Sequence, residues 1–139
     1  IPVISTIGTD SNGQAYNINS DTVAAALAGS LKAERLLYLT DVEGLLEDVS
    51  DPASKISKIG ISSLNDLIDK GIVKSGMIPK AQACIDAIKE GVASAHMVDG
   101  RIPHVLLLEL FTDAGIGTMV LPEDMLNSFK SETHEQDQL

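Results

Sequence analysis

The sequence predicts an α/β protein in which helices pack on a buried, mainly parallel sheet. The chain has 139 residues, of which 44% are hydrophobic and only 3% aromatic, so its core must be built from Ala, Val, Ile and Leu. That composition is typical of helices packed on a parallel sheet. Residues 35–40 are nearly continuously apolar, as strands buried on both faces are. Length and composition together predict one soluble globular domain.

Charge and cysteine content exclude several classes of function. Ten Lys and Arg stand against twenty Asp and Glu, and this formal net charge of −10 argues against binding to nucleic acid or to an anionic membrane. Cys84 is the only cysteine, which rules out an intrachain disulfide and suggests a reducing compartment. No run is long and apolar enough to span a membrane, and the start lacks a signal-peptide pattern. Because the chain opens without Met on an apolar run, we expect it to be a piece of a longer protein.

The first elements should be a strand, a tight return and a helix. Residues 3–7 read as a short buried strand. Residues 8–13 are dense in turn formers, so a hairpin or loop should return the chain to Asn17. A helix is expected next over about 20–32, where small residues would allow close packing on a sheet.

The start of this helix is a candidate polar site. Asn19 or Ser20 can cap the first free N–H groups, and Asp21 lies in the first turn, where the helix dipole favours a carboxylate. The same N–H groups also favour a bound anion. Capping alone explains most clusters of this kind, so both interpretations stay open here.

A candidate ligand loop follows the apolar strand. Ligands of open α/β sheets bind outside the carboxyl ends of the strands, so the polar turn at 41–44 could hold one, although it also fits an ordinary turn. Residues 47–57 predict an exposed excursion. A helix should then run from Ser62 or Ser63, as its cap, through Lys70.

A second polar helix start is predicted at residues 71–80, which contain two glycines and two lysines. The helix should begin near Pro79 and run to Glu90. Lys80 then lies in the first turn, where the helix dipole disfavours a cation unless an anion is bound beside it. A phosphate would fit, because backbone N–H groups and an ammonium commonly bind phosphoryl groups together. An exposed lysine without function is the equally weighted alternative, since its unfavourable placement is small in energy.

The remaining chain should add a strand, an apolar helix and a last strand. Residues 93–98 read as a strand. Residues 104–111 are apolar on nearly every side, which predicts a helix buried in the domain or in an assembly. Residues 115–120 predict a turn into a final strand. Residues 122–139 should form a polar tail that is disordered from Ser128 onward.

Several common site motifs are absent. The sequence holds no Walker-type GxxxxGK[ST] and no GxGxxG. Its three histidines and Cys84 lack metal-ligand spacing, so no protein-bound metal is predicted.

Three motifs in order resemble the carboxyl-terminal half of the amino-acid kinase family, in particular members acting on N-acetyl-L-glutamate. They lie at 17–21 (NINSD), 39–45 (LTDVEGL) and 76–80 (GMIPK), and the resemblance covers residues 1–121. It implies a three-layer αβα sandwich with a mainly parallel sheet whose second half binds ATP with Mg²⁺. The implied reaction transfers the γ-phosphoryl group of ATP to the γ-carboxylate of N-acetyl-L-glutamate, in arginine biosynthesis.

The resemblance also implies a role for each matching residue. Lys80 would stabilise charge on the transferred phosphoryl group, and Asp21 would hold catalytic lysine side chains. Asn17 would contact the acylated amino acid, with Asn19 nearby. The nucleotide would be framed by Asp41, Val42, Glu43, Gly44, Leu45, Leu46, Ile72, Val73, Lys74, Gly76 and Met77.

Residues 95–119 are similar to the corresponding segment of arginine-inhibited, hexameric members of the family. By that similarity His96, Glu109 and Gly115 would bind arginine, with the Glu109 carboxylate receiving its cationic end. A capped helix and a turn are the alternative explanation. In cyanobacteria and plants such enzymes also bind a PII-type signalling protein. A cytoplasmic location, or the plastid stroma in a plant or alga, is implied.

The family's amino-terminal half, which supplies Gly-rich loops, another catalytic lysine and the main dimer surface, is missing from the sequence. We therefore expect the 139-residue chain to be inactive by itself. Two alternatives stay open: another amino-acid kinase, acting on glutamate, aspartate, carbamate or UMP, or a non-catalytic nucleotide- or arginine-binding module that mediates assembly.

Overall fold

The centre of the molecule is a four-stranded sheet. The computed structural model describes residues 1–48, 50–112 and 115–136. In spatial order the strands are β3 (Arg35–Thr40), β5 (Ser94–Asp99), β6 (Thr118–Leu121) and β4 (Lys58–Gly60). β3 pairs parallel with β5 and β4 parallel with β6, while β5 and β6 run antiparallel. The sheet is therefore mixed but mostly parallel, as predicted.

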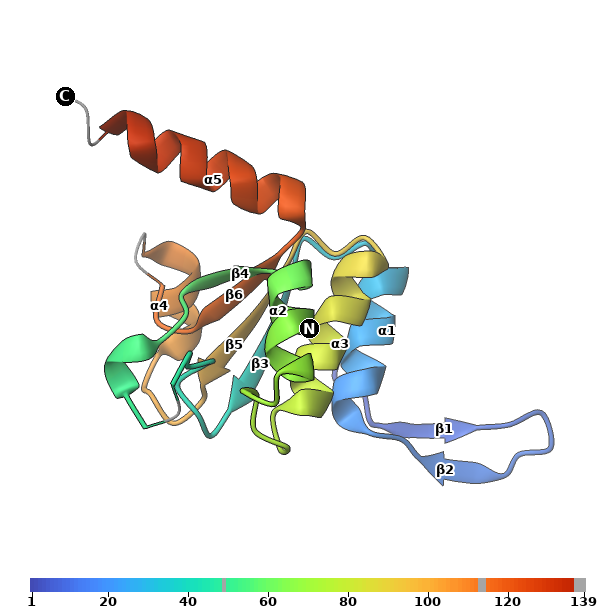
Figure 1. Cartoon of the computed structure of the whole chain (residues 1–139). Coiled ribbons are helices and arrows are strands. Elements are labelled where there is room, and N and C mark those ends of the chain that lie inside the picture. The colour runs from blue at the N-terminus through green and yellow to red at the C-terminus, as the bar shows by residue number, and fades with distance from the viewer. Residues whose placement is uncertain (49, 113–114, 137–139) are drawn as a thin grey trace.

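Helices cover both faces of this sheet (Figure 1). They are α1 (Ser20–Ser30), α2 (Ile61–Asp69), α3 (Ile78–Lys89), α4 (Val105–Phe111) and α5 (Glu123–Gln136), with a short 3-10 helix, η1 (Pro52–Ser54). Strand side chains alternate between faces. Ala95 and Met97 of β5 join the core cluster that includes α3, whereas His96 contacts Glu109 of α4 on the opposite face. The predicted three-layer αβα arrangement is confirmed.

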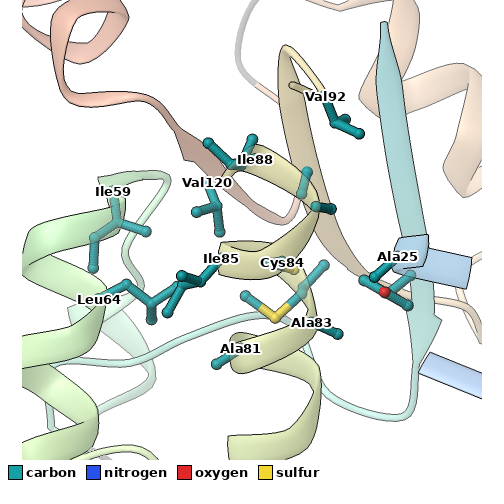
Figure 2. Close-up of a cluster of buried hydrophobic side chains, with 14 of the residues drawn as sticks. Ala25, Ile59, Leu64, Ala81, Ala83, Cys84, Ile85, Ile88, Val92 and Val120 are labelled. Atoms are coloured by element: carbon teal, nitrogen blue, oxygen red, sulfur yellow. The ribbon is translucent and has the colours of Figure 1, made fainter. Parts of the chain in front are cut away.

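The core is built from small and aliphatic side chains around α3. Figure 2 shows Ile85 extending toward Leu64 of α2, with Ile88, Ile59 and Val120 of β6 nearby. Ala25 and Ala28 of α1 are buried, so α1 can lie close to α3. Cys84 lies within this cluster, and burial raises the pKa of its thiol to about 12. The thiol is therefore protonated, as expected for a core cysteine.

The amino-terminal segment differs from the prediction. Residues 3–7 do not form a buried strand: the exposed fraction is 95% for Val3 and 64% for Ile7. β1 (Ile7–Thr9) and β2 (Ala15–Asn17) instead form the expected hairpin, which projects from the body of the molecule (Figure 1). Residues 3–7 are indeed largely apolar, but no part of the described chain packs over them.

Helix α4 is also less buried than its composition suggested. It begins at Val105, after His104 in the left-handed conformation with φ 59°. Its buried side chains are Val105 and Glu109, while Leu106, Leu107, Leu108 and Phe111 are exposed. Burial all round within this chain was thus a wrong expectation, and burial in an assembly stays a prediction.

Three further differences from the prediction involve the end of the chain. β4 directly follows the predicted polar excursion, and this short strand, held by its pairing with β6, was not predicted. Neither Ser62 nor Ser63 caps α2: its N-cap is Gly60, and the Ser62 N–H donates to Glu123 Oε1 at 2.8 Å. In place of a tail that is disordered from Ser128, α5 continues to Gln136, with two carboxylates in its first turn and Leu126 buried. Residues 137–139 lie outside the described part.

Candidate active site

Two helix starts meet at one edge of the sheet. α1 precedes β3 and α3 precedes β5 along the chain, so both helices begin at the edge where these parallel strands end. Asn19 caps α1, because its Oδ1 accepts the N–H groups of Asp21 at 3.0 Å and Thr22 at 3.1 Å. Pro79 occupies an early position of α3, as predicted. Both helix starts thus lie where α/β sheets usually hold ligands.

Asp21 and Lys80 join these two helix starts. Lys80 Nζ donates to Asp21 Oδ2 at 2.9 Å, and the two side chains are 27% and 14% exposed. The predicted meeting of this carboxylate and this cation is confirmed. Asp21 also supplies the negative partner that Lys80 needs in a first helical turn, so a bound anion is not required to explain that lysine. The pair still reaches solvent, and can therefore reach a ligand.

Tyr38 was not singled out by sequence reasoning, although it helps to hold Asp21. Its hydroxyl donates to the Asp21 carbonyl oxygen at 2.8 Å from within β3, and burial raises its pKa. A single tyrosine in a stretch predicted to be a buried strand was the available signal, because a buried phenol usually finds a hydrogen-bond partner. In the structure Tyr38 is buried, whereas Leu39 beside it is exposed. The bond to Asp21 ties the first turn of α1 to the sheet.

A cavity of about 300 Å³ lies at the same edge. It is lined by Arg101 and by ten residues of the predicted nucleotide site: Asp41, Val42, Glu43, Gly44, Leu45, Leu46, Ile72, Val73, Lys74 and Met77. Gly76, also predicted, does not line it. Met77 is the N-cap residue of α3, so the cavity adjoins the helix start that carries Lys80.

The end of β3 shapes the cavity loop. Thr40 Oγ1 accepts the Val42 N–H at 3.0 Å, and the Leu45 N–H donates to Thr118 Oγ1 at 2.9 Å. Gly44 has φ 132°, and a Cβ there would lie 3.2 Å from the Thr118 backbone nitrogen. Both the backbone conformation and the close approach require glycine at this position. The loop is therefore fixed to β6 as well as to β3.

Arg101 is the lining residue that the sequence prediction missed. Its Nε and Nη2 atoms donate to the two carboxylate oxygens of Asp99, at 2.9 and 2.7 Å. These hydrogen bonds lower the pKa of Asp99 to about 2. The strand-end rule that identified 41–44 could have found Arg101, since β3 and β5 end side by side.

The predicted substrate residues lie next to the start of α1. Asn17 is exposed at the end of β2, and Asn19 is exposed as the N-cap. The two capping hydrogen bonds of Asn19 already explain an asparagine at this position. Asn17 can reach a ligand from the hairpin side.

The three predicted effector residues come together on the opposite face of the sheet. His96 Nδ1 lies 2.8 Å from Glu109 Oε1, and both side chains are 2% exposed. Glu109 Oε2 accepts the N–H groups of Ile116 at 2.7 Å and Gly117 at 3.1 Å. Gly115, with φ 57°, lies so close that a Cβ would be 3.3 Å from the same oxygen.

The Glu109 carboxylate is stabilised by these internal donors. Burial is the largest influence and raises its pKa, but hydrogen bonds from His96, Ile116 and Gly117 together outweigh it and leave the pKa below the ordinary value. The carboxylate is thus ionised and enclosed. Because the Glu109 side chain is only 2% exposed, an effector cation could reach it only if the surrounding structure opened.

The described residues contain no group of three or more His, Cys, Asp or Glu that could hold a metal ion. Within that same part of the chain, no helix combines the length and apolar character needed to cross a membrane.

Fold and site together define an α/β protein with a cavity, a carboxylate–ammonium pair and two helix starts at the carboxyl edge of its sheet. Residues 1–99 match the model of the amino acid kinase family. The chain belongs to this family.

Several curated proteins named acetylglutamate kinase are similar in sequence to this chain. The chain is 54% identical over 121 residues to the acetylglutamate kinase of Nostoc sp., covering 87% of this chain and 41% of that protein. For the acetylglutamate kinase of Prochlorococcus marinus the identity is 56% over 121 residues, covering 87% and 40%. For that of Desulforamulus reducens it is 52% over 123 residues, covering 88% and 43%. The chain thus spans about two fifths of the length of these curated relatives.

Solved structures agree on the fold. N-acetylglutamate synthase from Neisseria gonorrhoeae, complexed with coenzyme A and L-arginine, matches with a TM-score of 0.75 and 28% identity, covering 86% of this chain and 27% of that one. Carbamate kinase from Giardia lamblia, bound to AMP-PNP, matches with a TM-score of 0.64, covering 82% and 36%; its 21% identity supports the fold alone.

Proposed function

We propose that this chain is the carboxyl-terminal, ATP-binding part of an enzyme that phosphorylates the γ-carboxylate of N-acetyl-L-glutamate, a step of arginine biosynthesis. The observation that carries the proposal is the Asp21–Lys80 pair, which joins two helix starts beside a cavity. The identity to proteins named acetylglutamate kinase supports this acceptor. The adjoining cavity supports the use of a nucleotide.

The cavity suits the adenosine end of ATP. Its walls include Val42, Leu45, Ile72, Val73 and Met77, which offer apolar contacts for a base. From there the phosphates would extend toward the start of α3, where the Lys80 ammonium favours an anion. The acylated amino acid would approach from the side of Asn17.

In this reaction an oxygen of the substrate γ-carboxylate attacks the γ-phosphorus, and the bond from that phosphorus to the oxygen bridging to the β-phosphate breaks. The nucleophile is already ionised at neutral pH, so no general base is needed. Lys80 would stabilise the negative charge on the phosphoryl group as it moves, and Asp21 would hold the Lys80 ammonium in place. The protein's contribution is thus positioning and charge stabilisation.

Mg²⁺ is proposed to accompany ATP, and it supplies charge neutralisation on the phosphates. The described residues hold no carboxylate cage for it, which fits an ion held mainly by nucleotide oxygens.

Arginine inhibition is proposed for the same enzyme, through His96, Glu109 and Gly115. The match to a synthase complexed with L-arginine supports it, because that protein shares this fold. Since Glu109 already accepts the Ile116 and Gly117 N–H groups, arginine would have to rearrange this loop to reach the carboxylate. A hexameric assembly, a PII-type partner and a cytoplasmic or plastid location stay predictions from the resemblance.

The test is a coupled ADP-release assay on the complete enzyme with N-acetyl-L-glutamate, glutamate, aspartate, carbamate and UMP as acceptors. Turnover should be fastest with N-acetyl-L-glutamate, and the 139-residue chain alone should show none. Faster turnover with another acceptor would make this a different amino-acid kinase. Arginine binding in calorimetry without any nucleotide binding would instead favour a non-catalytic module.

A further inference from the structure

Arg101 adds a cation to the lining of the cavity. It follows β5, whereas the proposed nucleotide loops follow β3 and α2. Of the cavity-lining residues, Lys74 and Arg101 are the cations, and Asp41 and Glu43 are the carboxylates. Lys74 lies on a loop already assigned to the nucleotide. Arg101 follows β5, the strand that pairs with β3.

The position of the guanidinium is fixed by two strands. Asp99, the last residue of β5, is buried and holds Arg101 through both carboxylate oxygens, a planar geometry that leaves little freedom to the guanidinium. Between them, the Gly100 N–H donates to the Thr40 carbonyl oxygen at 2.8 Å, which ties this turn to the end of β3. Arg101 is therefore presented from a rigid turn.

The guanidinium keeps unused donors in an acidic environment. Its side chain is 68% exposed, and within the described chain Asp99 is its only hydrogen-bond partner. The pKa of Arg101 is raised chiefly by Asp99, and the charges of Asp41 and Glu43 add to the effect. A chain with net charge −10 and two carboxylates in its cavity opposes a polyphosphate. A cation at this point offsets that repulsion.

We propose that Arg101 is a nucleotide-binding residue whose remaining N–H groups donate to phosphate oxygens of a nucleoside triphosphate, with Asp99 as the residue that positions it. The proposal rests on the proposed function and adds a contact from β5. The turn after β5 does not need the Arg101 side chain to close it, because the Arg101 backbone N–H already donates to Asp99 Oδ1 at 2.9 Å.

The test compares R101Q with R35Q in the complete enzyme, using calorimetry with ATP and with adenosine. Arg35 is a matched control, since its half-exposed side chain makes, among the described residues, only a surface ion pair with Glu34. R101Q should weaken ATP binding by about tenfold, the scale of one hydrogen bond to a charged group, and leave adenosine binding unchanged. R35Q should change neither. D99N, which keeps the cation but loosens it, should weaken ATP binding by less than R101Q.

Each other outcome overturns the proposal. Equal losses for ATP and adenosine would place the contact on the base or ribose. ATP binding by R101Q as tight as wild type, with an unchanged unfolding temperature, would leave Arg101 a turn residue while the proposed function still stands. Failure of the wild-type enzyme to bind ATP would remove the proposed function itself.

Discussion

Two carboxylates in this molecule each contact a basic side chain at nearly the same distance, yet they lie in opposite environments. Asp21 lies 2.9 Å from Lys80, and Glu109 lies 2.8 Å from His96. The first pair is 14% and 27% exposed at the edge of the cavity. The second is 2% exposed on both sides and lies between β5 and α4.

The number of partners separates the two pairs further. Glu109 receives donors on both oxygens, from His96 and from the Ile116 and Gly117 N–H groups. Asp21 receives only Lys80 on its carboxylate within the described chain. A closed, fully satisfied pair orders the structure around it, whereas an open pair with spare capacity can meet a ligand. Distance alone does not distinguish these roles.

The largest effect expected from this comparison is on stability. E109A should lower the free energy of unfolding by about 3–5 kcal/mol, because it removes a buried acceptor and leaves His96 Nδ1 and the Ile116 and Gly117 N–H groups without their partner. E34A is the matched control, since Glu34 is 84% exposed and makes a long contact of 3.7 Å with Arg35. Its effect should be within about 1 kcal/mol. Urea unfolding of the complete protein measures both.

Equal unfolding curves for E109A and E34A would contradict a structural role for Glu109. Retained stability combined with lost arginine inhibition would favour the effector role instead. The two roles of this residue are thus separable by experiment.

The next effect is on turnover. K80A in the complete enzyme should reduce kcat by about 100- to 1,000-fold, the range for removal of one preorganised charge-stabilising group. The half-buried position of Lys80 predicts only a small change in unfolding. K89A, at the exposed end of the same helix, should leave kcat within about twofold, since the lost charge acts only on the helix end. A K80A enzyme as active as K89A would remove Lys80 from the mechanism.

Sequence reasoning found the parts of the site that depend on local pattern. Helix starts, a strand-end turn and a family motif were enough to bring Asp21 and Lys80 together, and the structure confirms the meeting. Their catalytic roles stay predictions. Arg101 was missed although the same strand-end rule applies to β5.

What the sequence did not predict depends on distant partners. β4 is only three residues long inside a polar stretch, and it forms because β6 pairs with it from far along the chain. The start of α2 is satisfied by Glu123, not by the adjacent serines. The exposed leucines of α4 show a further limit: an apolar pattern predicts burial but does not say against what.

The smallest expected effect is on the pH dependence of stability, and it separates the enclosed Glu109–His96 pair from the Asp99–Arg101 pair, whose cation is exposed. The pKa of Glu109 is lowered from 4.5 in the folded state, so its ionised form contributes stability that is present above pH 4.5 and lost as pH falls further. The difference in free energy of unfolding between wild type and E109Q should therefore shrink below pH 4.5. For D99N the corresponding difference should persist to lower pH and fade between 3.8 and about 2, because the pKa of Asp99 lies at about 2.

High salt should weaken the effect of D99N, whose partner is exposed, and spare that of E109Q. Equal salt sensitivity of the two variants would contradict the distinction between a pair that is enclosed on both sides and a pair whose cation is exposed.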